Sequence, residues 1–328
     1  MQLSKATAAS GRPKARLWDQ ARRLFRGRNL LILYAMIPLT IYALLIWIIP
    51  VGYGMIISLT DWSPMDLNPT TFVGLENYKE AFSSELMGKA IVNSTRYALF
   101  TVGLGVPLAL IIAILLNSIS RGRGIFRLLF FLPVVTQVVA VGIVWREALY
   151  APRLGMLNAV LRVIRSTLGL SFDLPRYLND PAIALYCVGA MAIWRNLGYN
   201  IVLFMAGLSG IPRAYYDAAY IDGAGRLDAF RHVTLPLLKP TLVFVLVTGI
   251  ASAMQVFTEI YVMTTSYASG AMMGTPAFST LTLVPELYQR AFSEWRFGYA
   301  SAQAVIIFVI ITAISLFLLR TGRTRWEY

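Results

Sequence analysis

Six long apolar runs, separated by polar segments, constrain the fold of this chain more than any other feature. About 20 apolar residues in a helix, rising about 1.5 Å per residue, cross the roughly 30 Å of hydrocarbon in a bilayer. Hydrophobic residues make up 57% of the chain and charged residues only 14%, which excludes an ordinary soluble domain. We therefore predict an all-α polytopic membrane protein with six transmembrane helices, at about 30–57, 91–117, 126–149, 182–207, 241–265 and 298–320.

Positive charge is distributed unevenly between the two sides that these spans define. The termini and the polar segments on the same side carry 18 lysines and arginines, whereas the opposite side carries 8. Basic residues favour the cytoplasmic side of a membrane, so we expect both termini in the cytoplasm. The net charge of +13 then follows mostly from this topology and does not indicate a nucleic-acid-binding surface.

The polar segment 212–240 has the pattern of a helical hairpin. Pro212 can open a short helix, because its missing N–H is not needed in the first turn. Gly223 can adopt the backbone angles of a tight reversal. A second short helix is predicted at about 225–233, ended by Leu235-Pro236. A polar hairpin on the cytoplasmic side predicts contact with another protein.

Several residues of this hairpin form a position-specific pattern, namely Asp217-Ala218-Ala219, Asp222-Gly223-Ala224, Phe230, Thr234-Leu235-Pro236 and Pro240. The pattern closely resembles the EAA loop of permease subunits in bacterial ABC importers. Asp217 stands where the family usually has glutamate, which keeps the charge but shortens its reach. The resemblance implies that this loop lies in a cleft of an ATPase subunit and couples closure of the ATPase dimer to the membrane. It assigns this role to Asp217, Ala218, Ala219, Asp222, Gly223, Phe230, Leu235 and Pro236.

Shorter motifs occur throughout the chain, among them Gly74-Leu75-Glu76-Asn77-Tyr78, Asn93-Ser94-Thr95, Phe131-Leu132-Pro133, Gly155-Met156-Leu157-Asn158, Leu197-Gly198-Tyr199 and Gly298-Tyr299-Ala300. From about residue 30 to 320, they look like the motifs of carbohydrate-uptake permeases of the maltose and glycerol-phosphate type. The resemblance implies a bacterial inner-membrane complex with a partner permease, two ATPase subunits and an extracytoplasmic solute-binding protein. The partner permease is either a second copy of this chain or, as is usual in this family, a different chain. ATP and Mg²⁺ would bind to the ATPase subunits.

The residues themselves give no sign of catalysis. The chain has no G-x-x-x-x-G-K-[ST] phosphate-binding loop, so ATP must be hydrolysed elsewhere. Its single histidine is His232 and its single cysteine is Cys187, which leaves no intrachain disulfide and no cluster of metal ligands. We expect a transport subunit that is not an enzyme and holds no cofactor or metal.

Polar side chains inside the apolar spans form the candidate substrate path, because such groups are costly to expose to hydrocarbon. They are Gln137, Asn196, Tyr199, Asn200, Gln255, Thr258, Glu259, Tyr261 and Gln303. Amides, hydroxyls and carboxylates beside aromatic rings match the hydroxyl groups and C–H faces of a sugar. Hydrogen bonding between helices would explain the same residues. Arg195, near the middle of its span, needs an acidic partner such as Glu259.

Two amphipathic segments complete the organisation. The segment 17–25 has an apolar face and an arginine-rich face, which predicts an interfacial helix on the cytoplasmic leaflet, with a disordered basic tail as the alternative. The segment 156–168 repeats this pattern and is predicted to lie along the outer membrane surface. We divide the chain into a basic N-terminal segment, 1–29, a permease domain, 30–320, and a cytoplasmic tail, 321–328.

These observations predict a permease that imports a carbohydrate by alternating access, driven by ATP hydrolysis in partner subunits. Neutral di- or oligosaccharides are the first choice of substrate, followed by acidic oligosaccharides and glycerol-phosphate compounds. Two other classes stay open. An ion-coupled secondary carrier would need a relay of several ionisable groups in the membrane, and Glu259 alone is weak evidence for one. A membrane scaffold protein would need no polar cavity.

Overall fold

The computed structural model of the chain describes residues 27–66, 70–119, 121–265 and 273–322. Contacts divide the chain into two compact units, Met1–Ile56 and Ile57–Tyr328. The amphipathic segment predicted at 17–25 and the residues 323–328 of the predicted tail lie outside the described residues. The domain boundaries at 29 and 320 remain predictions.

The described residues of the first unit form an apolar helix. α2 (Gly27–Ala43) continues through a π turn, η1 (Leu44–Ile48), into α3 (Ile49–Ile57). Pro50, which lacks a backbone N–H, follows this π turn, and a π turn is one way for a helix to accommodate such a residue. The 24 residues Tyr34–Ile57 are apolar enough to cross a membrane, in agreement with the first predicted span.

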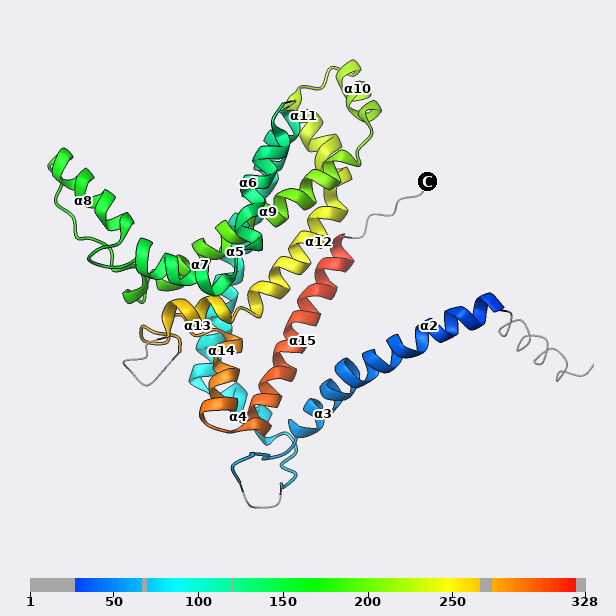
Figure 1. The fold of residues 1–328 in the computed structure, drawn as a ribbon, viewed down its shortest axis with the longest axis vertical. Coiled ribbons are helices and arrows are strands. Elements are labelled where there is room, and N and C mark those ends of the chain that lie inside the picture. Colours follow the sequence, from blue (N-terminus) through cyan, green and yellow to red (C-terminus); the bar gives the residue numbers. More distant parts are fainter. Residues whose placement is uncertain (1–26, 67–69, 120, 266–272, 323–328) are drawn as a thin grey trace, which may run out of the picture. The chain divides into compact units, whose positions relative to one another are not determined.

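The second unit is built from helices and connecting segments (Figure 1). Within its described residues, the β structure comprises an isolated bridge between Thr60 and Phe72. The helical elements, in chain order, are α4 (Glu76–Ser83), α5 (Glu85–Ser118), α6 (Arg123–Val135), α7 (Val138–Val144), η2 (Trp145–Leu149), α8 (Met156–Leu168), η3 (Tyr177–Asn179), α9 (Ala184–Ser209), α10 (Arg213–Ile221), α11 (Arg226–Ala229), η4 (Phe230–Thr234), α12 (Leu235–Met254), α13 (Thr258–Thr264), α14 (Leu283–Tyr288), η6 (Gln289–Ser293) and α15 (Phe297–Gly322).

Four helical stretches in the described residues are long and apolar enough to cross a membrane, or up to five if a bent pair counts as one span. Besides Tyr34–Ile57, they are Glu85–Ser118, Arg226–Met254 and Phe297–Gly322. α9, at the place of the fourth predicted span, has 26 residues but carries three strongly polar side chains, Arg195, Asn196 and Asn200. The all-helical membrane fold is confirmed, whereas the count of six spans remains a prediction.

The third predicted span, 126–149, is not one straight helix. α6 and the stretch Val138–Leu149 meet at an angle of 93°. Thr136 and Gln137 have extended backbones at the break, and Pro133 lies inside the last turns of α6. Proline lacks the N–H that would bond to the carbonyl four residues back, so the last turns of α6 lack one helical hydrogen bond.

The fifth predicted span, 241–265, also needs correction. α12 ends at Met254, and three residues separate it from the short helix α13. The backbone amides of Gln255 and Val256 donate hydrogen bonds to the carbonyls of Ser252 and Ala253, respectively, three residues back. The polar residues predicted for the end of this span therefore lie on and after a helix break.

Small residues allow the helices of the second unit to pack closely. α5 packs against α9 and α12, and α12 packs against α15. Ala90, Ala109 and Ala113 of α5 are fully buried, and Gly189 of α9 faces the Phe100 ring of α5. Small side chains at such interfaces are the usual means by which membrane helices approach one another.

The segment 273–288 packs against α5 and the end of α12. The Asn93 amide donates to the carbonyls of Phe278 and Leu281, and the Ser94 hydroxyl accepts from the Leu283 amide. The Thr282 hydroxyl donates to the carbonyl of Val256. The polar motif Asn93-Ser94 therefore fixes this segment beside the break that follows α12.

Candidate functional site

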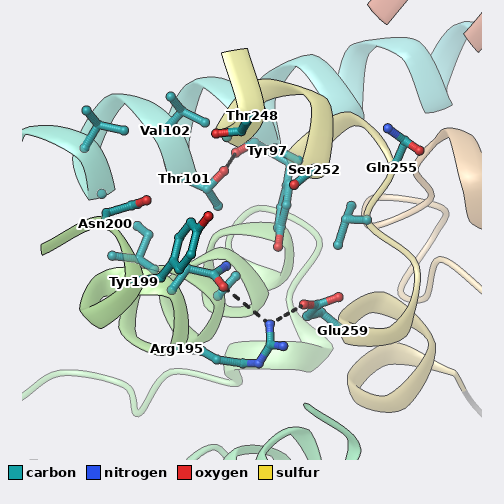
Figure 2. Close-up of a pocket in the computed structure, with 18 of the residues that line it drawn as sticks. Tyr97, Thr101, Val102, Arg195, Tyr199, Asn200, Thr248, Ser252, Gln255 and Glu259 are labelled. Atoms are coloured by element: carbon teal, nitrogen blue, oxygen red, sulfur yellow. Dashed lines mark hydrogen bonds and ion pairs between the residues drawn. The ribbon is translucent and has the colours of Figure 1, made fainter. Parts of the chain in front are cut away.

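A polar cavity of about 530 Å³ lies between α5, α9 and α12 and the break before α13 (Figure 2). This volume is within the range of small-molecule sites, roughly 300–1,000 Å³. The side chains that give the cavity its polar character are those of Tyr97, Thr101, Arg195, Asn196, Tyr199, Asn200, Thr248, Ser252, Gln255, Thr258 and Glu259. The lining offers hydroxyls, amides and one charge pair, which together can donate and accept several hydrogen bonds.

Six of the nine residues predicted for the substrate path line this cavity. They are Asn196, Tyr199, Asn200, Gln255, Thr258 and Glu259. α9 supplies the first three, and the end of α12 and the start of α13 supply the others. Residues far apart in the sequence are brought together because the break after Met254 places the polar ends of two helices opposite α9.

The other three predicted residues lie elsewhere. Gln137 is exposed at the bend between α6 and α7. The ring of Tyr261 stacks on that of Phe257, with 5.4 Å between their centroids. Gln303 is fully buried in α15, where its amide contacts the sulfur of Met87. A polar residue in an apolar run can face a cavity, a neighbouring helix or a bend, and the sequence alone does not distinguish these positions.

Arg195 and Glu259 form the ion pair that the sequence predicts. The Nη1 atom of Arg195 lies 3.5 Å from Oε1 of Glu259, and it also contacts the amide oxygen of Asn196 at 3.5 Å (Figure 2). The side chains are 23% and 15% exposed, so the pair lies in the cavity wall rather than at an open surface. Because the two charges compensate each other, the pair gives the cavity no net charge.

Sequence reasoning missed four polar residues of the lining, Tyr97, Thr101, Thr248 and Ser252. Tyr97 and Thr101 lie four positions apart on α5, and Thr248 and Ser252 lie four positions apart on α12. Residues at i and i+4 lie on the same face of a helix, so this spacing was a usable signal in both apolar runs. Tyr97 is only 3% exposed, which shows that its side chain is mostly packed among the helices.

The predicted hairpin, residues 212–240, begins as expected. α10 starts at Arg213 directly after Pro212, and Gly223 has a φ of +83° at the reversal. This left-handed conformation favours glycine, since it is strained for residues with a Cβ atom. α11 starts at Arg226, where the carboxylate of Asp228 accepts from the Gly225 amide.

The second helix of the hairpin does not end at Leu235-Pro236. A π turn, η4, joins α11 to α12, and the stretch Arg226–Met254 runs on for 29 residues. The Leu235 amide bonds to the Phe230 carbonyl, five residues back, just before Pro236. This wider turn accommodates the missing N–H and the ring of the proline, which would disturb a regular helix. The hairpin is thus continuous with an apolar helix.

The hairpin exposes a mixed charged and apolar surface. Asp217, Ala218, Asp222, Gly223 and Pro236 are exposed, whereas Ala219, Phe230 and Leu235 are partly buried. Four large apolar side chains beside them are more than half exposed, namely Tyr215, Tyr220, Ile221 and Leu227. Exposed apolar side chains next to charges are typical of a surface that binds another protein.

A side-chain contact joins the two arms of the hairpin. The hydroxyls of Tyr216 and Thr234 lie 3.1 Å apart and connect α10 to η4. The imidazole Nδ1 of His232 lies 3.1 Å from the carbonyl oxygen of Asp228, within the second arm. The contact between Tyr216 and Thr234 therefore connects α10 to the π turn that leads into α12, whose other end lines the cavity.

In the part of the chain that the structure describes, there is no group of three or more histidine, cysteine, aspartate or glutamate side chains that could hold a metal ion.

Comparison with known families and proteins adds independent information. A family model described as "Binding-protein-dependent transport system inner membrane component" matches residues 81–322. The probable ABC transporter permease protein YesP of Bacillus subtilis is 35% identical over 292 residues, covering 88% of this chain and 89% of the relative. The arabinooligosaccharides transport system permease protein AraP of the same organism is 31% identical, with coverages of 86% and 85%. The diacetylchitobiose uptake system permease protein NgcF of Streptomyces coelicolor is 31% identical, with coverages of 96% and 87%.

The fold is similar to that of a solved structure. A chain of a bacterial ABC transporter involved in the import of the acidic polysaccharide alginate aligns with a TM-score of 0.76, covering 95% of this chain and 100% of the other. The two sequences are 23% identical, so this likeness concerns the fold alone.

Proposed function

The chain belongs to the family of binding-protein-dependent transport system inner membrane components, and we propose that it moves a carbohydrate into the cell as a permease subunit of an ABC importer. The family assignment favours this function over an ion-coupled carrier or a membrane scaffold protein. The polar cavity within the helices is the observation that carries the carbohydrate assignment, because it combines hydroxyl, amide and aromatic groups.

The chemistry of the cavity favours a neutral sugar. Among its lining residues, Arg195 and Glu259 are the ones that carry full charges, and they pair with each other. A carboxylate or phosphate on the substrate would find no unpaired cation there. Relatives named for arabinooligosaccharides, diacetylchitobiose and trehalose/maltose support the same class, although another relative is named for sn-glycerol-3-phosphate.

The hairpin 212–240 is the proposed contact with the ATPase. Its exposed apolar side chains supply a surface for a cleft in that subunit, and Asp217 offers a negative charge to a basic group there. ATP and Mg²⁺ would bind in two such ATPase subunits, and this chain would hold neither. A second permease chain and an extracytoplasmic solute-binding protein complete the proposed complex.

We place both termini in the cytoplasm, because the side carrying the hairpin has 18 lysines and arginines against 8 on the other. Reporter fusions after Arg320 and between residues 273 and 296 are expected to indicate opposite sides of the membrane. Reporters that indicate the same side would contradict the predicted topology.

Replacing Asn200 with alanine is expected to weaken sugar binding and uptake. Asn200 lines the cavity, and the loss of one hydrogen-bonding partner for a sequestered hydroxyl costs about 1–3 kcal/mol, or roughly a 5- to 150-fold loss of affinity. Uptake of labelled sugar into proteoliposomes measures this change, with co-purification of the partner subunits as the test of assembly.

The matched control is Asn117→Ala. Asn117 is exposed near the end of α5 and bonds to Arg123 outside the cavity. Uptake by this variant is expected to equal that of the wild type. Equal uptake by Asn200→Ala and Asn117→Ala would show that the polar groups of α9 serve helix packing rather than sugar binding.

A further inference from the structure

Six aromatic side chains form a connected row that begins at the cavity. They are Phe257, Tyr261, Tyr288, Phe292, Phe297 and Trp295, and we call them the aromatic strip. Phe257 lines the cavity, Tyr261 belongs to α13, and the other four lie between the end of α14 and the start of α15. The strip therefore connects the cavity to the segment that precedes the last apolar helix.

Each ring of the strip contacts the next. The ring centroids are 5.0 Å apart between Phe257 and Tyr288, and 4.8 Å apart between Tyr288 and Phe292. The next separations are 5.5 Å from Phe292 to Phe297 and 6.4 Å from Phe297 to Trp295. All of these distances fall within the range of about 4.5–7 Å that is typical of interacting aromatic pairs. The strip thus offers a continuous aromatic surface.

The strip is not part of the buried core. Phe292 is 51% exposed and Trp295 is 41% exposed, and the other four rings are partly exposed. Residues in a closed core are buried, whereas each of these six residues keeps part of its surface exposed.

Charged residues lie next to the far end of the strip in the chain. Arg290 binds Glu286 and Glu294 at 2.8 and 2.7 Å, and the Arg296 guanidinium lies 4.7 Å from the centre of the Tyr299 ring. Arg296 also forms a bidentate pair with Glu80, which holds the pKa of that carboxyl below its usual value. The side chains of Arg296, Glu80 and Glu294 are 41%, 45% and 36% exposed. Because exposed ionised groups are costly in hydrocarbon, they argue against a surface that faces lipid tails. Aromatic rings flanked by polar groups are suited to a ligand with both C–H faces and hydroxyls.

We propose that the aromatic strip is an extended binding path for an oligosaccharide, whose sugar rings stack on it outside the cavity. This inference rests on the proposed function as a carbohydrate permease and extends it. The cavity holds one end of the sugar chain, and the strip binds the units that follow. The contribution of the strip therefore increases with the length of the oligosaccharide.

The test compares sugars of two and five units in proteoliposomes that contain the whole complex and its binding protein, with arabinooligosaccharides and chitooligosaccharides as probes. The double variant Tyr288→Ala with Phe292→Ala is expected to lose roughly tenfold in uptake of the five-unit sugar and less than twofold for the two-unit sugar. The variant Tyr288→Phe with Phe292→Tyr keeps both rings and is expected to retain uptake of both lengths. Phe308→Ala removes an exposed ring of α15 outside the strip and serves as the matched control.

An equal loss for both lengths, or no loss for either, would overturn the proposal. If the double alanine variant fails to assemble, Phe292→Leu replaces it, because leucine keeps an apolar side chain without a ring. A length-dependent loss in that variant supports the proposal. Failure of Phe292→Leu to join the second permease chain would instead identify the strip as a subunit interface. If the wild-type complex imports neither probe at either length, the failure lies in the proposed function.

Discussion

Replacing Asp217 with lysine is expected to abolish sugar-stimulated ATP hydrolysis while the chain still inserts into the membrane. Asp217 is exposed on α10, where it offers a negative charge to the proposed ATPase cleft. A partly exposed ion pair is worth only about 0–1 kcal/mol, so Asp217→Ala should have a mild effect. Lysine replaces attraction with repulsion in a contact that has lost much of its water, which costs several kcal/mol. Asp173→Lys reverses an exposed charge elsewhere and should leave hydrolysis unchanged.

The glycine at the reversal provides a second way to disturb the same step. Gly223 has a φ of +83°, and a Cβ atom there would meet nothing within 4 Å, so the first effect expected of Gly223→Val is backbone strain. Gly122 is a close match, with a φ of +80° and equally free space, but it lies outside the hairpin, before α6. We expect Gly223→Val to lose sugar-stimulated hydrolysis and Gly122→Val to retain it. Equal sugar-stimulated hydrolysis in both glycine variants, together with wild-type hydrolysis in Asp217→Lys, would show that the hairpin does not couple the ATPase to the membrane.

Replacing Gly198 with alanine is expected to destabilise the helix pair α6 and α9. A Cβ atom at Gly198 would clash with the backbone carbonyl of Phe130, which cannot rotate away as a side chain could. Overpacking of this kind typically costs 1–3 kcal/mol and occasionally more, and here a backbone must move. The thermal unfolding of the purified complex measures the effect.

Gly103→Ala, at a glycine of α5 with nothing within 4 Å, is the control and should unfold at or above the wild-type temperature. Equal midpoints would show that α6 and α9 are farther apart than the structure indicates.

Much of the fold could be predicted from the sequence. Long apolar runs and an uneven distribution of positive charge are compatible with only a few arrangements of helices in a membrane. The breaks within these runs were harder to predict. Pro133 precedes a real break at Thr136, whereas Pro236 follows a π turn through which the helix continues. Both prolines lack a backbone N–H, so the residue type alone does not distinguish a break from a wider turn. The sequence analysis therefore predicted an unbroken span across Pro133, where the helix breaks, and a helix end at Leu235-Pro236, where the helix continues.

The candidate site, like the fold, could be predicted from the sequence only in part. Polar residues on α9 and around the end of α12 were identified because they are unusual in apolar runs. Two of them, Arg195 and Glu259, form an ion pair in the cavity wall. Gln303 stands out equally in the sequence, yet it is fully buried against Met87. The direction in which a polar residue points depends on helix rotation, which a single sequence does not fix. Hydroxyls such as those of Thr101 and Ser252 were missed because such residues are common in apolar helices.

We propose that this chain couples ATP hydrolysis in partner subunits to the import of a carbohydrate. The most direct measurement is ATP hydrolysis and sugar uptake in proteoliposomes that contain this chain, the second permease chain and the ATPase subunits. Hydrolysis is expected to rise only when the binding protein and its sugar are both present, and uptake is expected to stop when ATP is withheld. Uptake that continues without ATP, or hydrolysis by the assembled complex that does not respond to any sugar-loaded binding protein, would contradict the claim.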